Sequence, residues 1–162
     1  MILANDSSHL PFLATEATLA EFIENFEQGT LPRAMWTHTA HLTVAAWYLL
    51  ALPEPEAIER VRAGIRHYNS AAGIPNTADS GYHETLTLFW LGILADFLHP
   101  CDGPAEKVAA IRLAVNEFGA QRALYRQYYS FDVVGSREAR AQWIPPDLAK
   151  NFRGNKTTLG DI

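Results

Sequence analysis

Three histidines in two short motifs carry the chemistry that this sequence could perform. His38 and His41 stand three residues apart in the segment Trp-Thr-His-Thr-Ala-His-Leu (36–42), and His83 belongs to Gly-Tyr-His-Glu-Thr (81–85). If the first segment is helical, this spacing puts both imidazoles on one face. Two such imidazoles can hold one metal ion, and a third histidine completes a set that leaves a position open for water. We therefore predict a metal site formed by His38, His41 and His83.

The predicted ligands do not select the metal. Imidazole nitrogens suit a divalent transition metal, and Zn, Fe, Ni, Mn and Cu all stay open. Glu84 or Glu27 would act as a fourth ligand or as a general base, and metal-bound water would be the nucleophile. With iron or copper, the metal would bind oxygen instead. The expected function is a metal-dependent hydrolase or oxidoreductase that acts on a small polar molecule.

Each of these residues also has a purely structural interpretation. A histidine in the first turn of a buried helix can simply hydrogen-bond a neighbouring carbonyl group. Glu84 can complement the positive end of a helix or reach back to cap it. Glu27 can be a solvated residue in the last turn of a helix. A structural or interaction protein whose histidines cap and pack is therefore one alternative function.

A second alternative is a binding module without metal. Its pocket would be lined by Trp36, His41, Tyr82 and Arg66. On the same helix Asn69 follows Arg66, which stands four residues after Arg62.

The row formed by Arg62, Arg66 and Asn69 can hold an anionic group of a substrate. Alternatively, this row is a solvated edge of the helix that is paired with acids such as Glu59. Trp36, Arg66, Asn69 and Tyr82 are the candidate substrate-binding residues.

Helices must position all of these side chains. Apolar residues recur at helical spacing along most of the chain, and no segment has the alternation typical of a strand. Thr15, Thr37 and Ser136 are placed to cap helices, while Gly29 and Pro53 are placed to end them. The predicted helices cover residues 15–28, 37–52, 55–72, 82–98, about 104–118, 121–129 and 136–143. The fold class is all-α: one helical bundle of residues 1–162, with four long helices, shorter packed helices and loosely ordered ends at 1–14 and 154–162.

The order of the helices brings the histidines together. If short loops make successive helices antiparallel, helices 37–52 and 82–98 run parallel and begin at the same end of the bundle. His38, His41 and His83 then gather at that end. The first and third helices finish there as well, which adds Glu27 and Asn69. The long loop 73–81 lies at the same end, where long loops often carry function.

Composition excludes several other classes. The chain of 162 residues carries 18 acidic and 13 basic side chains, a formal charge of −5. This balance argues against nucleic-acid binding. The sequence shows neither a signal peptide nor an apolar run long enough to span a bilayer, so we expect a soluble cytoplasmic protein without a membrane partner. The expected partner is a small-molecule ligand, and a homodimer through the fifth or sixth helix stays open.

The motifs also resemble those of a bacterial family of all-helical proteins of unknown function. The similar segments are Phe26-Glu27, residues 29–32, 36–42, Tyr68-Asn69, 81–85, 128–130 and 146–148. The resemblance covers nearly the whole chain and implies an all-helical fold, but no established activity. In layout alone, the predicted site is similar to the DinB-like metal-binding bundles, which gather three histidines from different helices with a different spacing.

Overall fold

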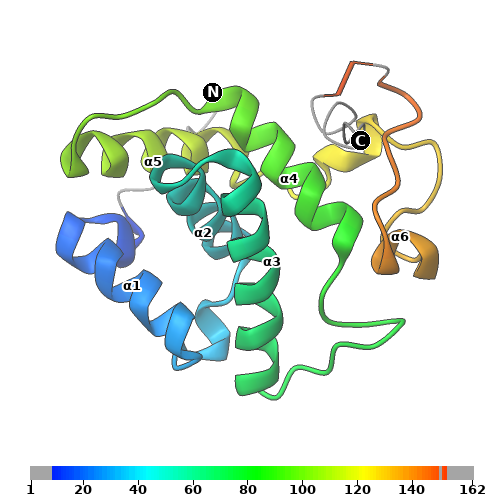
Figure 1. Cartoon of the computed structure of the whole chain (residues 1–162), viewed down its shortest axis with the longest axis horizontal. Helices are drawn as coiled ribbons and strands as arrows, with labels where there is room; N and C mark the ends of the chain where they lie inside the picture. The colour runs from blue at the N-terminus through cyan, green and yellow to red at the C-terminus, as the bar shows by residue number, and fades with distance from the viewer. Residues whose placement is uncertain (1–8, 150, 153–162) are drawn as a thin grey trace.

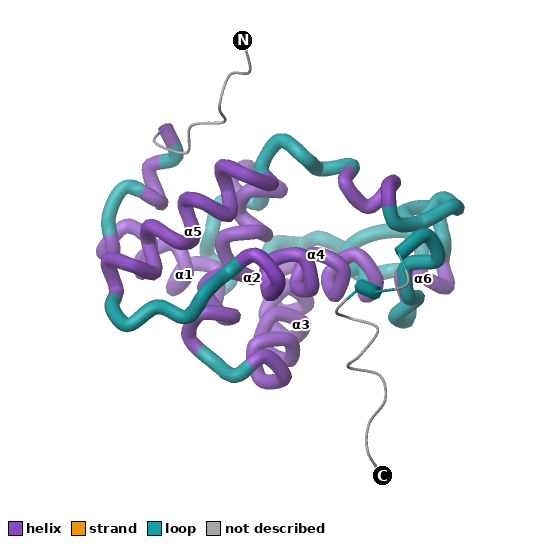
Figure 2. Tube along the Cα trace, turned by 90° about the horizontal axis from the view of Figure 1, so that it is seen from above, coloured by secondary structure: helices purple, strands orange, loops and turns teal. Residues whose placement is uncertain are grey.

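The protein is all-helical, as the sequence predicts. The computed structural model describes residues 9–149, 151 and 152, and this part of the chain contains helices and no strand (Figures 1 and 2). The α-helices are α1 (Glu16–Gln28), α2 (His38–Ala51), α3 (Glu54–Ala71), α4 (Glu84–Phe97), α5 (Pro104–Phe118) and α6 (Arg137–Ala141). No helix in the described ranges is long and apolar enough to cross a membrane.

Local sequence signals set where α1 begins and ends and where α2 begins. The Thr15 side chain accepts a hydrogen bond from the backbone N–H of Thr18 at 3.1 Å, and α1 ends where Gly29 adopts a left-handed φ of 72°. Thr37 caps α2 in the same way, because its hydroxyl accepts from the N–H of Ala40 at 3.3 Å. These caps satisfy backbone donors that a helix start would otherwise leave unpaired.

Helix α2 is the centre of the main core. It contacts α3, α4 and α5, and it is apolar on most of its faces. Its buried residues are Ala40, Leu42, Thr43, Val44, Ala45, Ala46 and Tyr48. Because α2 is covered on several sides, its first turn is held rigidly by its neighbours, and that turn carries two of the candidate histidines.

A second, smaller core joins the C-terminal segments to α4. It comprises Phe89, Tyr129, Val133, Ala139 and Phe152, and it lies beside α6 at the end of the molecule away from α1 (Figure 1). This packing places the segment after α5 against the start of α4.

One sequence prediction about this fold is wrong. Residues 121–129 do not form an α-helix. Only Leu124–Gln127 is helical, as a 3-10 turn, because its backbone N–H groups bond three residues back, for example Arg126 to the oxygen of Ala123 at 3.0 Å. Within the segment 1–14, which we expected to be loosely ordered, Pro11–Leu13 form a 3-10 turn with buried Phe12 and Leu13, and residues 1–8 lie outside the described residues. The expected loose end at 154–162 lies outside the described residues.

Candidate functional site

A pocket of about 440 Å³ opens where α2 begins, α3 ends and α4 begins. Its walls are mostly apolar or aromatic, with a few polar groups among them. The lining residues are Trp36, Thr37, His38, His41, Leu42, Ala45, Val61, Ile65, Asn69, Ile74, Gly81, Tyr82, His83, Leu86, Thr87, Trp90, Arg122 and Tyr125. The three candidate histidines thus line one pocket, as the argument from antiparallel neighbours predicts.

His83 acts as the N-cap of α4 and has no ring nitrogen to spare. Its Nδ1 accepts a hydrogen bond from the N–H of Leu86 at 3.2 Å, so the ring proton is on Nε2. Nε2 donates this proton to the carbonyl oxygen of Val133 at 2.9 Å. Desolvation by burial lowers the pKa of His83, which keeps the ring neutral. Binding a metal through His83 would require one of these two bonds to break.

His41 is held differently and keeps one nitrogen uncommitted. Its Nδ1 donates to the carbonyl oxygen of Thr37 at 2.8 Å, and its ring lies against Trp36 with 3.8 Å between ring centroids. Desolvation lowers the pKa of His41 to about 4, and the positive charges of a protonated His38 and of Arg122 push it in the same direction. The neutral ring therefore keeps a lone pair on Nε2, which has no hydrogen-bond partner among the described residues.

His38 also keeps one nitrogen uncommitted. Its Nε2 lies 3.2 Å from the carbonyl oxygen of Phe118, to which it donates, and its ring meets Trp90 edge-on at 4.8 Å between centroids. Desolvation lowers the pKa of His38, and the charge of Arg122 adds to the effect. The lone pair of Nδ1 has no partner within the part of the chain that the structure describes.

The hydrogen bonds of the three histidines limit which ring nitrogens could bind a metal ion. Among residues 9–149, 151 and 152, no group of three or more His, Cys, Asp or Glu side chains is placed to hold a metal ion. His38 and His41 each offer one lone pair, but His83 offers none in this conformation. The three-histidine metal site therefore stays a prediction.

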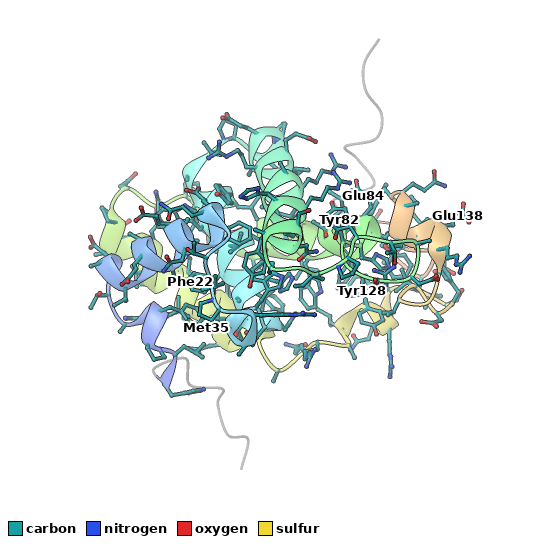
Figure 3. The ribbon with its side chains drawn as sticks, turned by 90° about the horizontal axis from the view of Figure 1, so that it is seen from below. Phe22, Met35, Tyr82, Glu84, Tyr128 and Glu138 are labelled. Carbon is teal, nitrogen blue, oxygen red and sulfur yellow. The ribbon has the colours of Figure 1, made fainter. Side chains whose placement is uncertain are left out.

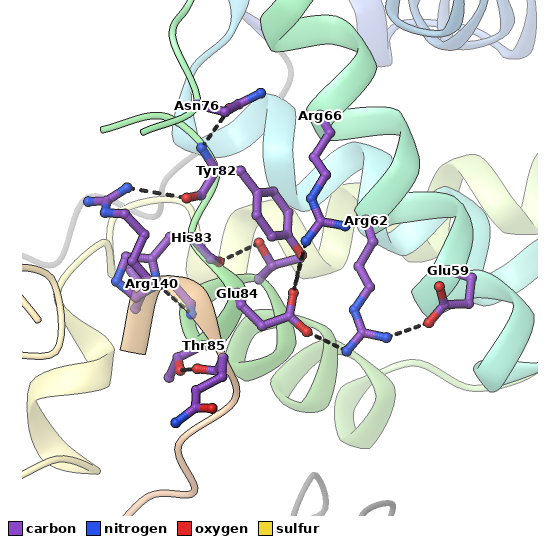
Figure 4. Close-up of polar contacts among 12 residues, drawn as sticks. Glu59, Arg62, Arg66, Asn76, Tyr82, His83, Glu84, Thr85 and Arg140 are labelled. Carbon is purple, nitrogen blue, oxygen red and sulfur yellow. Dashed lines mark hydrogen bonds and ion pairs between the residues drawn. The ribbon is translucent and has the colours of Figure 1, made fainter. Parts of the chain in front are cut away.

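Glu84 does not line the pocket. It belongs to a charged network with side chains of α3 (Figure 4), and Figure 3 shows it close to Tyr82. Its carboxylate accepts a hydrogen bond from the Tyr82 hydroxyl at 2.6 Å and pairs with Arg62, which also pairs with Glu59. Arg66 lies 3.8 Å from Glu84 and stacks over the Tyr82 ring at 4.1 Å. Arg62 and Arg66 are thus both paired with carboxylates, and neither of them lines the pocket.

Glu27 is also engaged away from the pocket. It accepts a hydrogen bond from the Tyr48 hydroxyl, and its carboxylate lies 3.8 Å from Arg60. Neither Glu27 nor Arg66 lines the pocket, whereas Trp36, Asn69 and Tyr82 do.

The loop between α3 and α4 fixes the position of Tyr82 and His83. The side-chain oxygen of Asn76 accepts from Asn69 Nδ2 at 3.0 Å and from the N–H of Tyr82 at 2.9 Å. Gly81 has a φ of 78°, and a Cβ there would come within 2.3 Å of a backbone oxygen. Arg140 of α6 donates to the carbonyl oxygen of Gly81 at 3.0 Å and to that of Tyr82 at 3.3 Å, which ties the loop to α6 (Figure 4 labels Arg140 and Tyr82). The contacts of Gly81 and Tyr82 thus fix the backbone that carries Tyr82 and His83 into the pocket lining.

Sequence reasoning did not include several residues of the pocket in the site, among them the two aromatic residues Trp90 and Tyr125 and the cation Arg122. For Trp90 a signal existed, because it stands seven residues after His83 and so falls on the same face of α4. Tyr125 lies in the 3-10 turn Leu124–Gln127 that follows α5, and Arg122 lies just before this turn. Both are far in sequence from either histidine motif. No motif in the sequence points to them.

Comparisons with protein-family models, with curated proteins and with solved structures find no match to this chain. The resemblance to a bacterial helical family therefore stays a prediction. Any functional conclusion must come from the pocket and its chemistry.

Proposed function

We propose that the pocket binds a small organic molecule with an aromatic body, and that it does so without a metal. The observation that carries this proposal is the cavity of about 440 Å³ with largely apolar walls and few polar groups. Small-molecule sites typically enclose about 300 to 1,000 Å³ and combine apolar walls with a few placed polar groups. The proposal adopts the second of the functions that the sequence left open.

The aromatic side chains support an aromatic ligand. Trp36 is held in place by three neighbouring rings, with 3.8 Å to His41, 4.8 Å to Tyr68 and 5.1 Å to Phe26 between ring centroids. Trp90 is fixed by Phe89 at 5.4 Å. Because these rings are already immobilised, stacking a flat ligand against them costs little side-chain entropy.

The histidines supply acceptors for ligand hydrogen bonds. His41 is neutral at pH 7, because its pKa is about 4, and His38 is shifted in the same direction. The lone pairs of His41 Nε2 and His38 Nδ1 can each accept one hydrogen bond from a ligand O–H or N–H. The pocket therefore favours a ligand that carries at least one such donor.

Filling the pocket tests the proposal. Ala45 lies on the pocket wall in α2. Ala45→Leu should therefore occupy part of the cavity and weaken binding of naphthalene-1-acetamide at least tenfold in calorimetry. Ala51→Leu is the matched control, because it makes the same change at an exposed position of the same helix and should leave affinity unchanged. Equal affinity for the two variants, or no binding to the unmodified protein, would contradict the proposal.

A metal-dependent enzyme stays the second candidate, supported by the two uncommitted nitrogens of His38 and His41. If it is correct, protein purified without a tag or chelator should contain near-stoichiometric metal in elemental analysis, and His41→Ala should lose it. His83→Asn can still cap α4 through its side-chain oxygen. Metal retained in His83→Asn would place the metal on the two other histidines, and metal lost would restore the three-histidine set.

The cytoplasmic location and the homodimer stay predictions of the sequence.

A further inference from the structure

We infer that the ligand of this pocket is an aromatic carboxylate whose anionic group is held by Arg122. This inference rests on the proposed function and names the chemical class of its ligand. It follows from the charges that line the pocket, from the free guanidinium of Arg122 and from the hydrogen-bonding state of the histidines.

Charge in the pocket has one sign. Among its described lining residues, Arg122 is the one with a permanent charge, and none carries a carboxylate. This contrasts with the chain as a whole, which has a formal charge of −5. Glu84, which does not line the pocket, is already paired with Arg62 and bonded to Tyr82. A ligand anion would therefore meet a cation in the pocket and no competing carboxylate.

Arg122 is free to bind such an anion. It forms no hydrogen bond or ion pair with any described residue, whereas Arg62, Arg137 and Arg140 are all engaged. Its charge lies close enough to lower the pKa of both His38 and His41. A guanidinium presents paired N–H donors that match the two oxygens of a carboxylate.

His38 and His41 have no free N–H with which to bind an anion, so Arg122 must bind it. Each neutral ring has one N–H, and both are used, by the carbonyl oxygens of Phe118 and Thr37. A neutral histidine in this state offers an anion only its lone pair, which repels it. The ligand should therefore place its carboxylate at Arg122 and its aromatic body against Trp36 and Trp90.

A cationic aromatic ligand is the opposite case. Faces of Trp and Tyr rings can attract a cation, and Trp36, Tyr82 and Trp90 all line the pocket. Arg122 would repel such a ligand, and the described lining offers it the lone pairs of neutral histidines but no carboxylate to balance its charge. Probes that differ only in charge can therefore decide the question.

The experiment uses three probes with one naphthalene ring system: naphthalene-1-acetate, naphthalene-1-acetamide and 2-(1-naphthyl)ethylammonium. Calorimetry at pH 7.5 should give an affinity for the acetate about tenfold higher than for the amide, and the weakest binding for the ammonium. Arg122→Gln should remove the preference for the acetate. Arg126→Gln is the matched control, because it removes the same charge from a nearby exposed arginine outside the pocket lining and should keep the preference.

The outcomes separate the two proposals. If the amide binds and the acetate binds no better, the carboxylate assignment is overturned while the pocket stands. If Arg122→Gln keeps the preference, or Arg126→Gln loses it, Arg122 is not the anion-binding residue. If none of the three probes binds, both the ligand class and the proposed function are wrong. Circular dichroism should show that both variants fold, since both side chains are exposed.

Discussion

Replacing Glu84 with alanine should lower the free energy of unfolding by about 3 kcal/mol, because the partly buried guanidinium of Arg62 loses its buried partner and keeps only an exposed one. The Glu84 side chain is only 10 % exposed, and it binds Arg62 and the Tyr82 hydroxyl together. Arg62 is itself part-buried, and its Nε has no hydrogen-bond partner among the described residues. Urea denaturation monitored by tryptophan fluorescence measures the loss.

Glu59 provides the matched control for this prediction. It pairs with the same guanidinium, but its side chain is 69 % exposed. Glu59→Ala should cost less than about 1 kcal/mol, as exposed ion pairs generally do. A loss in Glu84→Ala no larger than that in Glu59→Ala would show that the network does not stabilise the α3–α4 contact.

Acidification below pH 6.5 should destabilise the protein, because its histidines must lose their depressed pKa values on unfolding. The pKa of His41 is about 4 in the folded protein, against 6.5 for an unperturbed histidine. Between these values the unfolded chain binds more protons than the folded one, so stability is full above pH 6.5 and falls as the pH drops. His41 alone should remove about 2 kcal/mol between pH 7.5 and pH 5. His38 and His83, whose pKa values are also lowered, should add to the loss.

His41→Asn isolates the contribution of His41. The asparagine amide can donate to the carbonyl oxygen of Thr37, as Nδ1 of His41 does now. Unlike the imidazole, the amide does not titrate. Denaturation curves between pH 7.5 and pH 5 should therefore fall less steeply for this variant than for the unmodified protein. Parallel curves would mean that His41 titrates near its ordinary value.

The sequence predicted most of what depends on local signals. The capping residues Thr15 and Thr37, the stop at Gly29 and the apolar character of the central helix all act within a few residues, and the structure confirms them. The meeting of three histidines followed from topology, because two parallel helices must begin at one end.

The roles of the histidines depend on groups that are distant in sequence. The carbonyl oxygen that His38 contacts belongs to a residue 80 positions away, and that of His83 to a residue 50 positions away. No spacing rule within a helix reports such partners. These bonds decide which ring nitrogens remain available, and hence how well the site suits a metal.

Arg122 could not be found for a related reason. The sequence predicts an α-helix over residues 121–129, whereas the chain turns after Phe118 and continues as a 3-10 turn. The two conformations rotate successive side chains by different angles, so they aim them differently. Only the folded chain shows that this segment closes the side of the pocket.

The most direct test of the pocket is a two-dimensional NMR titration of the four tryptophan indole N–H signals with naphthalene-1-acetate. Trp36 and Trp90 line the pocket, whereas Trp47 and Trp143 do not, so the protein carries its own controls. We predict that the signals of Trp36 and Trp90 shift on addition of the probe, that those of Trp47 and Trp143 stay in place, and that Ala45→Leu suppresses the shifts. Four unmoved signals, or shifts confined to Trp47 and Trp143, would contradict the assignment of this pocket as the functional site.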